Sequence, residues 1–102
     1  MQTITFELQP NIANRIEKYL QFFGNKEIMF DKFIDYHINR IKREIALMQI
    51  DLKAYEKKFN MPSNKFYEQF ENGELGDDKD FILWSGIYEM QMNCKQKLQK
   101  LL

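Results

Sequence analysis

The stretch IDYHINRIKREIALMQIDLKAYEKKF, residues 34–59, decides most of the fold of this chain. Its apolar residues recur at alternating intervals of four and three, which places them on one side of a helix as a heptad seam. No Pro or Gly lies between Lys26 and Asn60, so we expect one uninterrupted helix of about 50 Å. Such a seam is expected to lie in a core or a dimer interface rather than to bind a ligand. It consists of Ile34, Ile38, Ile41, Ile45, Met48, Leu52, Tyr55 and Phe59.

A shorter helix is predicted before this one. Pro10 is favoured in the first turn of a helix, and Ile12, Ile16, Leu20 and Phe23 then fall on one helical face. Gly24 and Asn25 follow, which are residues that typically stop one helix and cap the next. The sequence therefore predicts a helix near residues 11–23 and a second one that starts directly after Asn25.

The C-terminal part is predicted to hold two further helices. Pro62 ends the long helix, because Pro disfavours the helical conformation in the residue before it, and Ser63 can cap a new start. The short helix after Ser63 is rich in aromatic residues. Gly73 and Gly76 interrupt the chain before a last helix that carries Trp84 and Leu98. We expect a hairpin-like helical tail.

Residues 1–9 have the pattern of a β-strand. Ile4, Phe6 and Leu8 alternate with polar residues, and β-branched and aromatic side chains favour strands. No second alternating segment is present in the chain, and a lone strand is not stable. We therefore expect the strand to pair with a second copy of the chain in an intermolecular ribbon, followed by two helices, which is the ribbon-helix-helix arrangement.

The outward side of this ribbon would be a candidate DNA-binding surface. Thr3, Thr5 and Glu7 would face away from the shared core, where Thr can contact phosphates or base edges and Glu can accept from cytosine. The backbone amides near Asn25 and Lys26 would suit a phosphate. The other interpretation is that these short polar residues simply face solvent. The usual basic or amide side chain is absent from the ribbon, which lowers the expected affinity.

The aromatic residues of the tail are candidates for partner binding. They either form the core that folds the tail against the long helix or remain exposed as anchors for a partner, and we expect both uses, with core for most of them. The set is Phe66, Tyr67, Phe70, Phe81 and Trp84.

Two segments resemble a known family. The N-terminal strand and the Gly24–Asn25 turn resemble ribbon-helix-helix antitoxins of prokaryotic toxin–antitoxin modules. The segment MPSNKFYEQFENGELGDDKDF, residues 61–81, with Trp84 and Tyr88 after it, looks like a segment that recurs at the end of small antitoxin-like proteins. Related forms read Ser-x-x-x-Phe-Tyr, whereas here the first aromatic residue follows Ser63 by three positions. The resemblance implies neutralisation of a partner toxin, such as a small ribonuclease.

Composition excludes several other classes. The 102 residues carry 15 basic and 15 acidic side chains, which argues against non-specific coating of nucleic acid. Cys94 is the single cysteine and His37 the single histidine, so neither a disulfide, a zinc site nor a nucleophile pair is expected. Asp77, Asp78 and Asp80 are expected to cap a helix rather than to bind a metal, and no cofactor is expected. With neither a leader nor a membrane-spanning run predicted, a cytoplasmic protein is expected.

These observations combine into one prediction. The fold is mainly α, with the N-terminal ribbon, a long second helix and a helical tail; residues 1–60 dimerise and bind DNA, and residues 61–102 bind a partner. The chain is expected to be a non-enzymatic, antitoxin-like homodimer or higher oligomer that neutralises a toxin protein and represses its own operator. The alternative is a helical, coiled-coil adaptor that binds proteins without binding DNA.

Overall fold

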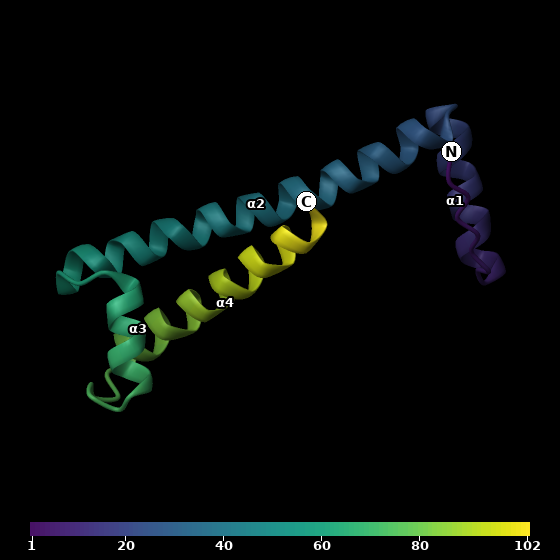
Figure 1. The fold of residues 1–102 in the computed structure, drawn as a ribbon. Helices are drawn as coiled ribbons and strands as arrows, with labels where there is room; N and C mark the ends of the chain where they lie inside the picture. Colours follow the sequence, from purple (N-terminus) through teal and green to yellow (C-terminus); the bar gives the residue numbers. More distant parts are fainter. The chain divides into compact units, whose positions relative to one another are not determined.

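Four helices make up the computed structural model, which describes all residues 1–102 (Figure 1). The chain divides into two compact units, Met1–Tyr36 and His37–Leu102, which we call the N-terminal and C-terminal units. The division falls inside the second helix. The predicted functional boundary at residue 60 stays a prediction. The helices are α1 (Pro10–Phe23), α2 (Lys26–Phe59), α3 (Ser63–Glu71) and α4 (Lys79–Leu101).

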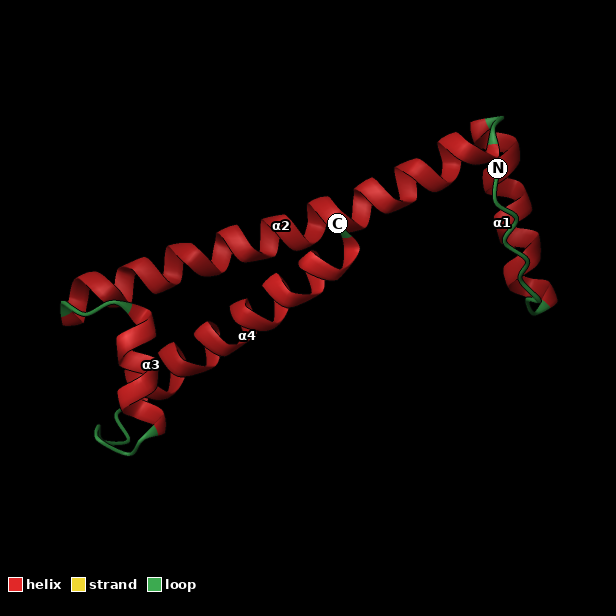
Figure 2. Cartoon of the chain, viewed as in Figure 1, coloured by secondary structure: helices red, strands yellow, loops and turns green.

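The prediction of an N-terminal β-strand is wrong. Residues 1–9 have no regular secondary structure, and the chain contains no strand (Figure 2). A strand needs the N–H and C=O groups of a neighbouring strand, and no other segment of this chain provides them. Ile4, Phe6 and Leu8 consequently remain exposed. The ribbon-helix-helix fold is therefore corrected to an all-helical architecture.

The helix limits in the N-terminal unit follow from local chemistry. Pro10 occupies the first turn of α1, and Gly24 closes the helix in the left-handed conformation, with φ at 73°. The side-chain oxygen of Asn25 then accepts hydrogen bonds from the backbone N–H groups of Glu27 at 2.8 Å and Ile28 at 3.2 Å. Asn25 is thus the N-terminal cap of α2, as its residue type predicted.

The turn between α2 and α3 differs in one respect from the expectation. Asn60 adopts a left-handed φ of 51° and Pro62 precedes the first residue of α3. The Ser63 side chain does not cap the helix. Instead, the Glu56 carboxylate on α2 accepts a hydrogen bond from the Ser63 backbone N–H at 2.8 Å. The start of α3 is therefore stabilised from the preceding helix, which ties the two helices together.

The C-terminal unit is an antiparallel pairing of α2 and α4 that is closed by α3. Trp84 on α4 stacks against Tyr55 on α2 at a ring-centroid distance of 5.7 Å. Further along α4, the buried Gln91 side chain donates to the Ile45 carbonyl at 3.2 Å and to the Gln49 side-chain oxygen at 2.9 Å. Residues later in α4 therefore contact residues earlier in α2, which shows that the two helices run in opposite directions. The C-terminal part of the heptad seam is covered by a helix of the same chain.

The core of this unit is small and aromatic. Leu52, Phe66 and Trp84 are its fully buried residues, with at most 1% exposure each, and come from three different helices. Half-buried side chains surround them, among them Tyr55 and Phe59 from the seam. Each helix of the C-terminal unit therefore depends on the other two for its burial.

Candidate partner-binding surfaces

The aromatic residues predicted to bind a partner are mostly in the core. Phe66 and Trp84 are buried and stack almost parallel, with ring centroids 3.7 Å apart and an interplanar angle of 4°. Phe81 lies against Phe66 at 5.5 Å, and Phe66 also stacks on Phe70 at 5.6 Å. The structure therefore brings these residues together, but as packing within the C-terminal unit rather than as an open patch.

A polar network fixes the centre of this core. The Trp84 indole N–H donates to the Ser63 hydroxyl at 2.9 Å, and both side chains are buried. A buried indole N–H without a partner would be destabilising. Ser63 was predicted to be a cap, but its hydroxyl is the acceptor for Trp84, a role that depends on α4 folding back over α3.

Tyr67, Phe70 and Phe81 are the members of the aromatic set that retain partial exposure. Tyr67 packs beside Tyr88 with ring centroids 4.9 Å apart. Burial raises the pKa of the Tyr67 hydroxyl above its usual value, with smaller contributions from Glu71 and Glu89. These three rings border the core, and they are the part of the predicted patch that stays partly exposed.

The residues predicted to bind DNA are exposed but do not form the expected ribbon. Thr3, Thr5 and Glu7 lie in the irregular segment before α1, and Lys26 is the exposed first residue of α2. The Asn25 side chain already accepts from two of the first backbone amides of α2. Two of the backbone amides in this region therefore already have an acceptor within the chain, and DNA binding by these residues stays a prediction.

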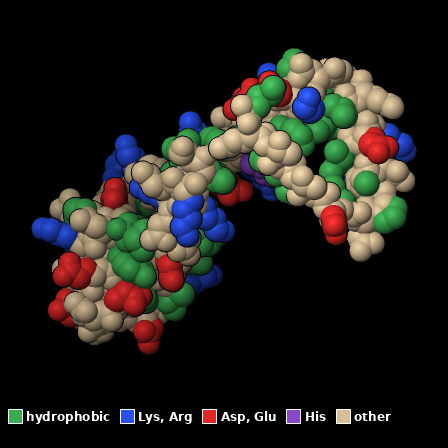
Figure 3. Space-filling model, turned by 45° about the vertical axis from the view of Figure 1, so that its right-hand side comes forward, with side chains coloured by type: hydrophobic (Ala, Val, Ile, Leu, Met, Phe, Trp, Pro, Cys, Tyr) green, Lys and Arg blue, Asp and Glu red, His purple; other side chains and the backbone are tan.

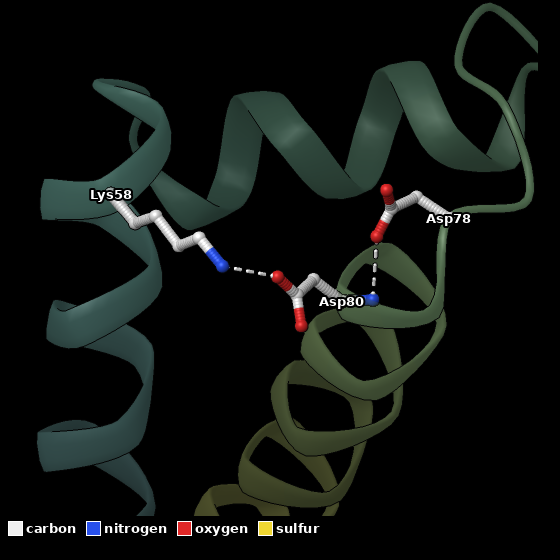
Figure 4. Close-up of polar contacts among 3 residues, drawn as sticks. All are labelled: Lys58, Asp78 and Asp80. Atoms are coloured by element: carbon white, nitrogen blue, oxygen red, sulfur yellow. Dashed lines mark hydrogen bonds and ion pairs between the residues drawn. The ribbon is translucent and has the colours of Figure 1, made fainter.

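The acidic residues Asp78 and Asp80 at the start of α4 act as structural groups. The Asp78 carboxylate accepts from the Asp80 backbone N–H at 2.8 Å, which makes Asp78 the N-terminal cap of α4 (Figure 4). Asp80 forms an ion pair with Lys58 on α2 at 2.5 Å. The hydrogen bond and charge of Asp80 raise the pKa of Lys58. No group of residues in the chain is arranged to hold a metal ion.

Exposed aliphatic side chains on α2 form a surface that the sequence analysis missed. Leu47 and Ile50 lie outside the heptad seam and are 57% and 65% exposed. The available signal was the presence of two large apolar residues on the side of the helix opposite the seam. The heptad seam alone supplied enough apolar residues for the predicted core, so Leu47 and Ile50 were not needed to explain it.

A second exposed apolar group lies on α4. Ile82, Leu83 and Met90 are all exposed, and Gly86 lies between them on the helix. A Cβ atom added at Gly86 would meet nothing within 4 Å. Packing within the chain therefore does not require this glycine. Figure 3 shows that hydrophobic side chains also reach the surface of this unit between charged groups.

The N-terminal unit has the least internal burial. Met29 is its one buried hydrophobic residue, at 9% exposure. Large apolar side chains in α1, in the first part of α2 and in the segment before α1 face solvent instead. They include Ile4, Phe6, Leu8, Ile12, Tyr19, Phe22, Ile28 and Phe30. This unit presents more apolar surface than its own core can account for.

Comparisons with protein-family models, curated proteins and solved structures find no match for this chain. None of the four helices combines the length and apolar character needed to cross a membrane.

Proposed function

We propose that this chain is an antitoxin-like protein-binding protein that self-associates through its N-terminal unit and binds a partner protein through its C-terminal unit. The observation that carries the proposal is the exposed apolar surface of the N-terminal unit. Apolar surface of this extent is typical of protein interfaces. We propose binding rather than catalysis, because the sequence offers one histidine and one cysteine and no nucleophile pair is predicted from it.

Self-association follows from the size of the N-terminal unit. Units below about 40 residues usually need disulfides, a metal or oligomerisation to be stable. Met1–Tyr36 contains no cysteine, and the chain has no metal-binding cluster. Oligomerisation is the remaining option, and a second copy of the chain is always present to cover the exposed apolar surface. The charges permit it, because four basic and five acidic residues in Met1–Tyr36 leave little net repulsion.

Binding of a toxin by the C-terminal unit rests on the resemblance of residues 61–81 to antitoxin-like proteins. The core gives the unit a fixed surface before any partner arrives, so binding would not have to order a flexible tail. Neutralisation would be steric, with the bound unit covering the active site of the toxin. Self-association would add valency to this interaction.

The adaptor without DNA binding is the second candidate function, and the absence of the ribbon favours it. Thr3, Thr5 and Glu7 have no sheet to hold them in the spacing that groove reading requires. Operator binding therefore stays a separate prediction. It is tested by fluorescence anisotropy of the chain against its own promoter DNA at two salt concentrations, with a Thr3→Ala/Thr5→Ala variant as control.

Sedimentation velocity of the full chain tests self-association. We expect a dimer or higher oligomer for the natural sequence and a monomer for Phe22→Ser/Phe30→Ser, in which two exposed side chains of the N-terminal unit are changed. The matched control, Ile82→Ser/Leu83→Ser on α4, should remain associated. A natural chain that sediments as a monomer at high micromolar concentration would contradict the proposal.

Coexpression tests the antitoxin function. If the product of a gene adjacent to this one arrests growth, coexpression of the chain should restore growth and the two proteins should copurify. A toxic neighbour that neither binds the chain nor is relieved by it would leave the adaptor as the better candidate.

A further inference from the structure

The outer side of α2 in the C-terminal unit carries a second stripe with heptad spacing. The residues follow one another at intervals of three, four, three, four and three, so they line up along the helix. At 3.6 residues per turn this stripe lies roughly 150° around the helix from the heptad seam that packs on α4. We call it the outer stripe. It consists of Arg40, Arg43, Leu47, Ile50, Ala54 and Lys57.

The outer stripe is exposed along its whole length. Single exposed apolar residues are normal on protein surfaces and need no explanation. Here two large aliphatic side chains, Leu47 and Ile50, lie on successive turns of the same face, and Ala54 continues the face with a small side chain. This arrangement provides an apolar centre at which another helix can approach closely.

The charges of the stripe identify the partner that fits it. Arg40, Arg43 and Lys57 flank the apolar centre at both ends. The nearest acidic residues, Glu44 and Asp51, lie along one edge outside the stripe, so the basic side chains predominate on the stripe itself. Arg40 has an acidic neighbour in Glu44 at 3.7 Å, at the edge of the stripe, and both side chains remain largely exposed. A partner with carboxylates beside its own apolar residues would complement this pattern.

A second copy of the same stripe does not fit. An antiparallel pairing centred on Leu47 and Ile50 would bring Arg40 opposite Lys57 of the other copy at each end. A parallel pairing would bring each basic residue opposite itself. Like charges facing each other across a helix pair are unfavourable and select against that pairing. A nucleic acid fits the charges but leaves Leu47 and Ile50 without apolar contacts.

We propose that the outer stripe of α2 binds an amphipathic helix of another protein, one whose apolar stripe is flanked by Asp and Glu. This inference rests on the proposed function, since it assigns the surface on which the C-terminal unit receives its partner. The partner helix would cover Leu47 and Ile50 with its apolar side chains. Its carboxylates would pair with Arg43 and Lys57.

The test measures fluorescence anisotropy of a labelled synthetic helix added to the full chain. The probe has Leu at the heptad core positions and Glu at the flanking positions, and its control has Lys in place of every Glu. We expect the Glu probe to bind and the Lys probe not to bind. Equal binding of both probes, or no binding of the Glu probe, overturns the proposal.

Two variants then locate the binding surface. Leu47→Ser/Ile50→Ser should weaken binding of the Glu probe about 100-fold, because two aliphatic side chains no longer contribute to the contact. The control Ile82→Ser/Leu83→Ser changes exposed side chains on α4 and should bind as the natural chain does. Unchanged binding of the α2 variant, or an equal loss in the control, overturns the assignment to the outer stripe.

Charge reversal gives a readout that partial unfolding cannot imitate. Arg43→Glu/Lys57→Glu should lose the Glu probe and gain the Lys probe. Sedimentation of Leu47→Ser/Ile50→Ser should show unchanged self-association; dissociation would mean that the stripe contacts a second copy. Displacement of the Glu probe by duplex DNA at moderate salt would assign the stripe to nucleic acid instead.

The outcome for this surface is separable from the outcome for the proposed function. If the chain binds its toxin and the α2 variant binds the toxin equally well, the partner-binding function stands and the outer stripe is not its site. If no toxin binds any form of the chain while the Glu probe still selects the outer stripe, the antitoxin function fails and the helix-binding surface remains.

Discussion

The two units of this protein have similarly apolar sequences but very different cores. In the C-terminal unit, Trp84 and Phe66 are buried and stack on each other at 3.7 Å, whereas in the N-terminal unit Phe22 is 81% exposed. The difference is that α4 comes back along α2 and covers the seam of the C-terminal unit, while the N-terminal unit buries only Met29 among its hydrophobic residues. Apolar periodicity therefore creates a face, but a second element has to cover it before it becomes a core.

The largest expected effect on stability comes from truncating Trp84 in the C-terminal unit, and truncating Phe22 in the N-terminal unit is the comparison. Trp84→Ala should lower the free energy of unfolding by about 3–5 kcal/mol, because it removes a fully buried ring and leaves a cavity. Phe22→Ala should change the stability of the C-terminal unit by less than about 0.5 kcal/mol. Denaturant unfolding followed by Trp fluorescence for Phe22→Ala, and by circular dichroism for both, measures the two values. Similar losses would mean that both units share one core.

A smaller effect is expected from the polar contact inside the core. Ser63→Ala removes the acceptor of the Trp84 indole N–H, and the unsatisfied donor should cost about 1–3 kcal/mol. The matched control is Asn64→Ala, which changes an exposed neighbour on the same helix and should leave stability almost unchanged. Denaturant unfolding compares the two variants. If both unfold at the same denaturant concentration, the hydrogen bond makes no measurable contribution to the stability of the C-terminal unit.

One substitution should stabilise the C-terminal unit. Gly86 lies inside α4, and a Cβ atom there meets nothing within 4 Å. Gly86→Ala should therefore raise the free energy of unfolding by about 0.5–1 kcal/mol, since Ala loses less backbone freedom in a helix. Thermal unfolding by circular dichroism measures the change. A destabilised variant would indicate that another chain approaches α4 closely at Gly86.

The smallest effect is expected from the surface ion pair between α2 and α4. The pKa of Lys58 is raised above its ordinary 10.5 by the hydrogen bond and charge of Asp80. The stabilisation is therefore fully present below pH 10.5 and is lost as the pH rises through the higher folded-state pKa. Lys58→Met should lose this small contribution at neutral pH, because exposed pairs are screened. The stability difference between natural chain and variant, measured at increasing alkaline pH, should shrink toward zero; a constant difference would point to lost packing instead.

Helix limits were largely predictable because they depend on neighbouring residues. Pro10, Gly24, Asn25 and Pro62 act within one helical turn, and the structure begins or ends helices beside each of them. Asp78 caps α4 for the same local reason. The continuous α2 likewise required only the absence of helix-breaking residues.

The failed strand and the misplaced site residues share one physical cause. Alternation at Ile4, Phe6 and Leu8 describes a preference, but a strand exists only where a second backbone completes its hydrogen bonds. The aromatic residues posed the same difficulty, because nothing in the local sequence distinguishes a ring that a returning helix covers from one that stays exposed. Leu47 and Ile50 were missed because their exposure depends on where α4 lies.

Short-range chemistry in the chain was enough to specify its helices, their caps and the seam along α2, since these depend on contacts within a few residues. The return of α4 across α2 and α3 settled the rest. It buried Trp84 against Phe66, turned the Ser63 hydroxyl from a potential cap into an acceptor, and left the outer side of α2 uncovered. Burial is a property of pairs of distant segments, so it becomes defined only when those segments meet.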